Sequence, residues 1–130
     1  MKIKQLSIFI ENRVGEVNEV ISVLSNADIS IRAFSLADGI DFGILRIIVP
    51  DTDYAQKVMQ DAGYKVSQTD VLCVEVPNIA GGILTTFNAF AQQNIFIQYM
   101  YSFSDNEVAK VIIRTNDIER SVEILSSQNV

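Results

Sequence analysis

The chain has 130 residues, of which 48% are hydrophobic, and a net charge of −6 with only ten basic residues. This charge argues against a nucleic-acid partner, because binding to phosphates depends on clustered Lys and Arg. With no histidine and a single cysteine, the chain lacks the commonest general base and metal ligand and forms no internal disulfide. No apolar run is long enough to cross a bilayer and no secretory signal is evident. We therefore expect a cytoplasmic protein with no membrane association, metal or cofactor.

The predicted elements alternate between strands and helices in chain order. Strands follow from alternating apolar residues, and helices follow from apolar stripes at helical spacing. In the first half, Asp51 or Asp53 is the predicted cap of the second helix and Gly63 its end. The pattern predicts a strand over residues 2–10, a helix from about Gly15 to 26, strands over 29–37 and 42–49, a helix over 54–62 and a strand over 64–69.

The second half repeats the first at an offset of 66 residues without a gap. Identical residues fall at matching places in the shared pattern: Leu6 and Leu72, Asn12 and Asn78, Gly15 and Gly81, Ile29 and Ile95, Ile31 and Ile97, Ile47 and Ile113, Asp51 and Asp117. A self-similarity at one fixed spacing indicates duplication of a whole structural unit. The matching elements are strands over residues 71–76, 95–104 and 108–115 and helices that include Ile83–Ala91 and Ile118–Leu125.

Each half therefore has the order β-α-β-β-α-β, the split βαβ or ferredoxin-like arrangement. The predicted fold class is α+β, with two tandem ferredoxin-like units over residues 1–69 and 70–130 and antiparallel sheets. By the repeat register, Val130 matches Tyr64. The second unit is consequently expected to lack its last strand in this chain, or to take it from a neighbouring segment.

The strand-to-helix loops carry the strongest functional signal. In the first unit the loop reads Asn12-Arg13-Val14-Gly15, and in the second it reads Asn78-Ile79-Ala80-Gly81. Glycine permits backbone angles that other residues avoid, and the first N–H groups of a helix favour a carboxylate. A carboxylate could bind N–H groups from Gly15 to Val17, or from Gly81 to Ile83.

These loops, each followed by an apolar helix and an Ile-x-Ile strand (Asp28-Ile29-Ser30-Ile31 and Asn94-Ile95-Phe96-Ile97), resemble the ACT domain. ACT domains are small-molecule-sensing modules of amino-acid-metabolising enzymes, and the resemblance covers nearly the whole chain. It implies that an amino acid binds at the seam between two ACT units. The proline usual before the loop glycine is replaced by Val14 and Ala80.

In serine-sensing ACT domains, an Asn in the loop and an Asn before the second strand hold the ligand. The resemblance transfers these roles to Asn12 with Asp28, and to Asn78 with Asn94. The first loop is the better predicted site, because Asp28 adds a charge-assisted contact to the ligand's ammonium. The complete set of predicted ligand-binding residues is Asn12, Arg13, Val14, Gly15, Glu16, Val17, Asp28, Ile31, Asn78, Ile79, Ala80, Gly81, Gly82, Ile83 and Asn94.

Simpler interpretations stay open beside these. The glycines could merely shape a turn, and Asn12 and Asn78 could cap the following helices. Glu16 and Glu19 are expected on a solvated helix face. The predicted partners are a small amino acid, a second copy of the chain and a regulated enzyme. A structural protein that uses its sheets for assembly is the alternative, and an enzyme is not expected, because no nucleophile–base pair or cofactor motif is evident.

Overall fold

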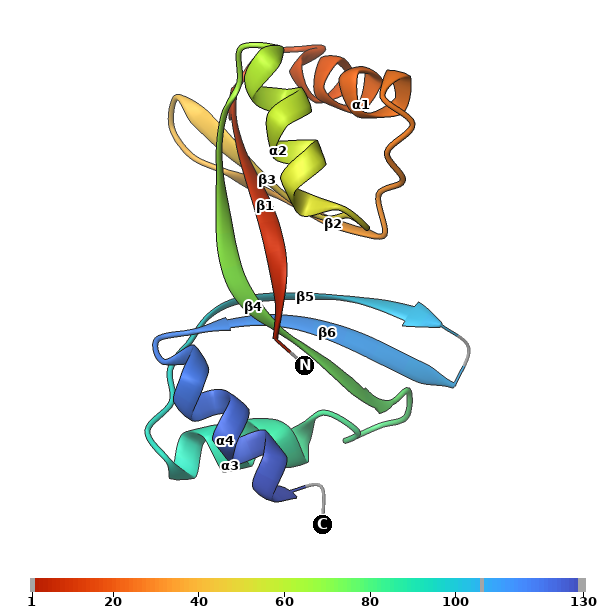
Figure 1. Ribbon diagram of the computed structural model, residues 1–130. Helices are drawn as coiled ribbons and strands as arrows, with labels where there is room; N and C mark the ends of the chain where they lie inside the picture. The colour runs from red at the N-terminus through yellow and green to blue at the C-terminus, as the bar shows by residue number, and fades with distance from the viewer. Residues whose placement is uncertain (1, 106, 129–130) are drawn as a thin grey trace. The chain divides into compact units, whose positions relative to one another are not determined.

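The structure, a computed structural model, describes residues 2–105 and 107–128 of the chain (Figure 1). Two compact units divide these residues. The first comprises Lys4–Thr69, and the second comprises the described residues from Asp70 onwards together with Lys2 and Ile3. The elements are β1 (Lys2–Glu11), α1 (Glu16–Asn26), β2 (Ala33–Asp38), β3 (Phe42–Ile48), α2 (Thr52–Asp61), β4 (Lys65–Pro77), α3 (Leu84–Gln92), β5 (Ile97–Asp105), β6 (Val108–Thr115) and α4 (Ile118–Gln128).

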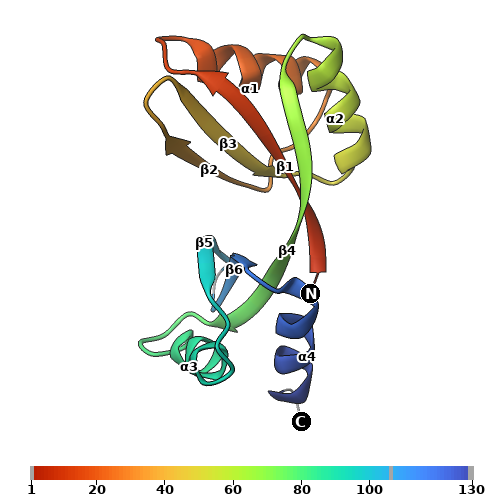
Figure 2. The ribbon, with the colours of Figure 1, turned by 90° about the vertical axis from the view of Figure 1, so that its left-hand side faces the viewer.

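The predicted α+β architecture of two ACT-like units with antiparallel sheets is confirmed. In the first unit the strand order is β2-β3-β1-β4, and α1 and α2 lie on the same side of the strands (Figures 1 and 2). In the second unit β4 pairs with β6 and β6 pairs with β5. No strand follows α4 in the part of the chain that the structure describes.

The strand registers reproduce the internal repeat. Leu6 of β1 lies opposite Ile47 of β3, and Leu72 of β4 lies opposite Ile113 of β6. The second pair is the first pair moved along the sequence by the repeat offset. All four side chains are fully buried. The duplication is therefore visible in the pairing of individual residues as well as in the order of the elements.

Each unit buries its own apolar core between sheet and helices. The first core joins strand residues such as Leu6 and Ile8 to Val20 and Leu24 of α1 and to Met59 of α2. The second core has the same construction, with Phe90 of α3 and Leu125 of α4 among the members: Leu72, Val76, Phe90, Ile95, Val111, Ile113, Ile118 and Leu125. Burial of these stripes away from water is the main favourable term in forming such units.

Two strand predictions need correction. The predicted strands over residues 64–69 and 71–76 are one uninterrupted strand, β4, which pairs with β1 and with β6. The first part of β4 belongs to the first unit and its remainder to the second. The strand predicted from Ile29 begins only at Ala33, where pairing with Ile48 starts. Among the described residues no helix is long and apolar enough to span a membrane.

Candidate functional site: the loops before α1 and α3

The loop between β1 and α1 is closed by three backbone hydrogen bonds. The N–H of Asn12 donates to Asp41 O (3.2 Å), that of Arg13 to Glu11 O (3.0 Å), and that of Glu16 to Arg13 O (3.3 Å). The loop after β4 makes the same three bonds at matching positions: Asn78 to Glu107 (2.8 Å), Ile79 to Pro77 (2.9 Å) and Gly82 to Ile79 (3.0 Å). Gly15 and Gly81 share a left-handed backbone, with φ of 88° and 78°. Both loops therefore need glycine at this position.

Asn12 anchors the loop and does not cap the helix. Its side-chain Nδ2 donates to Gly39 O at 2.7 Å and to Ile40 O at 3.5 Å, across the turn between β2 and β3. The N-cap of α1 is Gly15, which has no side chain, and that of α3 is Ile83. The hypothesis that Asn12 and Asn78 cap their helices is therefore wrong. These bonds hold the side-chain amide of Asn12 in place. An ammonium bonds only to an acceptor, so the Oδ1 atom is the group of Asn12 that a ligand ammonium could use.

The first loop opens into a hollow of about 440 Å³, which we call the loop hollow. The hollow brings together five of the predicted residues, Asn12, Arg13, Val14, Glu16 and Val17. It also contains groups that the sequence analysis missed. These are Ile10 and Glu11 at the end of β1 and Leu36, Ala37 and Asp38 on β2. Gly15, Asp28 and Ile31 are not among the lining residues.

Arg13 and Glu16 form an ion pair at the wall of the loop hollow. Arg13 Nη2 lies 2.9 Å and Nε 3.0 Å from Glu16 Oε2, and Nε lies 3.4 Å from Glu11 Oε2. Hydrogen bonding and attraction from Glu16 raise the pKa of Arg13. Glu16 is only 6% exposed. The expectation that Glu16 lies on a solvated face is wrong, because the partly exposed Arg13 side chain compensates its charge and a paired carboxylate tolerates burial.

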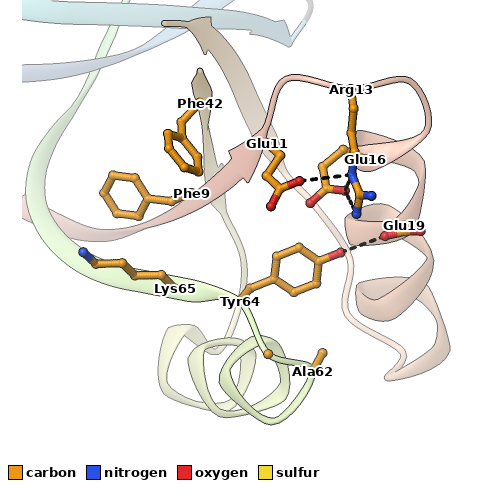
Figure 3. Close-up of a pocket in the computed structure, with 10 residues that line it drawn as sticks. Phe9, Glu11, Arg13, Glu16, Glu19, Phe42, Ala62, Tyr64 and Lys65 are labelled. Atoms are coloured by element: carbon orange, nitrogen blue, oxygen red, sulfur yellow. Dashed lines mark hydrogen bonds and ion pairs between the residues drawn. The ribbon is translucent and has the colours of Figure 1, made fainter. Parts of the chain in front are cut away.

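The same ion pair also borders a second hollow of about 410 Å³, which we call the Tyr64 hollow (Figure 3). Tyr64 points its hydroxyl at Glu19, donating to Oε2 at 3.4 Å. Burial and the charges of Glu16 and Glu19 raise the pKa of Tyr64, so its hydroxyl stays protonated at neutral pH. The other lining residues are Phe9, Glu11, Phe42, Ala62, Gly63 and Lys65.

Asp28 and Asn94 lie at the far ends of α1 and α3 from the loops. Because α1 has 11 residues, its two ends are about 16 Å apart at 1.5 Å per residue. A single unit therefore does not bring Asp28 to its own loop. The predicted pairing of Asn12 with Asp28 around one amino acid, at a seam between two units, stays a prediction.

The backbone explains why Asp and Asn stand at these two positions. Asp28 and Asn94 both have φ of 59°, and Asn and Asp tolerate this left-handed region better than most residues. Asp28 N–H donates to Ser25 O (3.0 Å) and Ile29 N–H to Leu24 O (3.0 Å), and the bonds of Asn94 and Ile95 match them. This pair of bonds is a Schellman motif. Gly63, with φ of 92°, fills the same position after α2.

Substitutions at Asp28 should follow its helix-ending role. Asp28→Gly is expected to leave the free energy of unfolding unchanged or slightly higher, because glycine adopts a positive φ without strain. Asp28→Ala is expected to lower it by about 1 kcal/mol, because an L-residue without a polar side chain is strained there. Urea denaturation of both variants and the wild type tests the order. Equal effects of glycine and alanine would contradict it.

The second loop departs from the first after its shared hydrogen bonds. The repeat places Gly82 at the position of Glu16, the first residue of α1, yet α3 begins at Leu84. A Cβ atom on Gly82 would lie 2.1 Å from Pro77 O. Ile79, at the position of Arg13, is 72% exposed. Ala80 and Ile83 complete this loop, which therefore offers no ion pair matching that of Arg13 and Glu16.

Comparisons with known proteins find a family model and solved structures that match the whole chain. A family model described as an ACT domain pair matches residues 1–130. The crystal structure of protein BT0572 from Bacteroides thetaiotaomicron is 41% identical, with a TM-score of 0.95 over 100% of this chain and 90% of that one. A search among curated proteins found no match.

Two more distant structures share the fold. The regulatory subunit of aspartate kinase from Thermus thermophilus is 15% identical, with a TM-score of 0.67 over 95% of this chain and 91% of that one. The corresponding subunit from Thermus flavus is 14% identical, with a TM-score of 0.68 over 97% and 92%. ACT domains are regulatory rather than catalytic modules and typically bind amino acids. Because the family model spans the entire sequence, this chain belongs to the ACT domain pair family.

Proposed function

We propose that this protein is a regulatory module that binds a small amino acid in the loop hollow and passes its occupancy to a partner protein. One observation carries the proposal. The loop hollow, of about 440 Å³, combines a cation (Arg13), which is paired with two of the three carboxylates in the lining, with a third carboxylate (Asp38) and an apolar wall (Leu36 and Val17). Small-molecule sites in proteins have this size and this mixture of apolar surface and a few polar groups.

A zwitterion could use both kinds of charged group in the hollow, the Arg13 guanidinium and the Asp38 carboxylate. Its carboxylate would bind at Arg13 and at the N–H groups that begin α1, where the helix carries partial positive charge. Its ammonium would face Asp38 or the Oδ1 atom of Asn12. Its side chain would lie against Leu36 and Val17, which favours a small or apolar amino acid.

We further propose that the predicted residues outside the hollow contact a ligand only across a seam with another unit. Asp28 and Asn94 lie at the opposite helix ends from the loops of their own units, so a loop needs a neighbouring unit, such as one in a second copy, to meet such a residue. The Asp28→Gly variant isolates this contribution, because it removes the carboxylate and keeps the helix end. A loss of affinity in that variant would support contact of Asp28 with the ligand.

The partner that we propose is an enzyme of amino-acid metabolism. The Thermus structures are regulatory subunits of aspartate kinase, that is, regulatory chains of an enzyme. We propose an analogous role for this chain, exercised as a homodimer in the cytoplasm. Size-exclusion chromatography with light scattering tests the dimer, and a monomer at all concentrations would contradict it.

A thermal-shift screen over the twenty amino acids tests ligand binding. A ligand that binds only the folded state adds about 2.7 kcal/mol of stability at a concentration of 100 times its Kd. We therefore expect at least one amino acid to raise the Tm at millimolar concentration. Asp38→Asn should weaken that shift, because it removes the acceptor for the ammonium. Asp61→Asn is the matched control, since Asp61 is exposed on α2 and pairs with Lys57 outside the hollow.

A flat screen would contradict the proposed function. It would favour the alternative, a structural protein whose sheets serve assembly. An equal loss of the shift in Asp38→Asn and Asp61→Asn would show that the net charge, rather than the contact in the hollow, is responsible.

A further inference from the structure

The two loops share their backbone hydrogen bonds but differ in the side chains that they present. Arg13 and Glu16 of the first loop correspond to Ile79 and Gly82 of the second. The first pair supplies a guanidinium at the edge of the loop hollow. The second loop has no cation at the matching position. If the two loops bind ligands differently, the cause lies in these two pairs of residues and in the start of α3, which begins two residues later than the repeat predicts.

The geometry of Arg13 leaves one edge of its guanidinium accessible to a ligand carboxylate. Its contacts to Glu16 and Glu11 use Nε and Nη2, whereas a guanidinium has five N–H donors in a planar fork. The Nη1 edge lies outside these contacts. The side chain is 61% exposed although Glu16 beneath it is buried. Arg13 is thus anchored on one side and accessible on the other.

Glu16 fixes the orientation of Arg13. A buried carboxylate next to a guanidinium holds it in one geometry, and a side chain that is already ordered loses less entropy when a ligand binds. The second loop excludes an equivalent arrangement, because any side chain at residue 82 would collide with the carbonyl oxygen of Pro77. The Arg–Glu pair consequently occurs at one loop only.

We propose that Arg13, positioned by Glu16, selects ligands with a free carboxylate in the loop hollow and restricts binding to one ligand per chain. This inference rests on the proposed function. Arg13 contacts the ligand carboxylate, and Glu16 is a positioning residue that acts through Arg13. The second loop, with Ile79 in place of the arginine, does not take an amino acid.

Calorimetric titration of the full chain tests the selection. The probes are L-serine, L-valine and L-leucine, each compared with its own carboxamide, which keeps the ammonium and the side chain. For the wild type we expect one site per chain and a carboxamide that binds at least about tenfold more weakly, as expected for loss of a charge-assisted hydrogen bond. In Arg13→Ala the amino acid and its amide should bind within about twofold of each other. Arg13→Lys should lie between, because an ammonium lacks the planar fork.

Two further variants separate selection from folding. Arg120→Ala is the matched control: it removes an exposed cation on α4 that donates to Gln93, and it should keep the tenfold discrimination. Glu16→Gln should reduce the discrimination and leave the affinity for the carboxamide unchanged. A purely structural role of Glu16 would instead lower the affinity for both ligands alike.

The outcomes distinguish the two proposals. Unchanged discrimination in both Arg13 variants, or two ligands per chain in the wild type, would overturn this inference and leave the proposed function standing. A wild type that binds none of the amino acids in either the screen or the titration would overturn the proposed function, and this inference with it. Arg13→Lys keeps the charge and the ion pair. If Arg13→Ala does not fold, the discrimination between amino acid and carboxamide in Arg13→Lys tests the inference instead.

Discussion

Replacing Phe90 with alanine is expected to lower the free energy of unfolding by about 3–5 kcal/mol, the range for large aromatic side chains removed from a core. Phe90 is 1% exposed and belongs to the core of the second unit. Its carbonyl also accepts the N–H of Ile95 at 2.8 Å, in the bond that ends α3. The substitution leaves that backbone bond in place but removes the ring that fills the space between α3 and the sheet.

Urea denaturation of the full chain, followed by circular dichroism, measures this effect. The matched control is Phe96→Ala, because Phe96 lies on the same unit and is 67% exposed. We expect that control to change the free energy of unfolding by less than about 1 kcal/mol. Similar losses from the two substitutions would contradict the position of Phe90 in the core.

Gly82→Ala is expected to cost about 2–4 kcal/mol, since its Cβ would lie 2.1 Å from the backbone oxygen of Pro77. Backbone atoms on both sides must move to relieve that contact, and the hydrogen bond from Gly82 N–H to Ile79 O lies in the same loop. We therefore expect the loss in stability to be accompanied by altered structure at the start of α3. Amide hydrogen exchange of the loop and α3 reports the second effect.

The neighbouring glycine is the control for this experiment. Gly81 has φ of 78°, yet nothing lies within 4 Å of its potential Cβ atom. Gly81→Ala should therefore cost only the backbone strain of an L-residue, about 1–2 kcal/mol. If Gly81→Ala were the more damaging substitution, the close contact at Gly82 would not be the dominant constraint on this loop.

Most of the fold was predictable because its signals are local. Strand alternation, helical stripes and the identities between Leu6 and Leu72 or Ile47 and Ile113 are readable in one dimension, and the register confirms them. The prediction of two separate strands over residues 64–69 and 71–76 was wrong because its signal is not local. Whether the residues around Thr69 and Asp70 continue a strand depends on pairing with distant segments, which no local pattern reports.

The candidate site was predictable only where it is contiguous in sequence. The residues from Asn12 to Val17 follow one another, so the loop motif located them, and most of them line the loop hollow. Leu36 and Asp38 enter the hollow from β2, and only the fold brings that strand to the loop. The predicted strand over residues 29–37, which stops just before Asp38, was the available signal. The burial of Glu16 was missed because it depends on the ion pair with Arg13.

The uninterrupted course of β4 across the boundary between the units limits how this chain can change during evolution. A flexible linker accepts an inserted residue at little cost. In a strand, a one-residue insertion moves every following side chain to the opposite face. An insertion between Thr69 and Asp70 would thus turn Leu72 and Val76 away from the core of the second unit or displace the strand from its partner. The two copies are free to diverge by substitution, as Arg13 and Ile79 have, but their spacing along the chain is fixed.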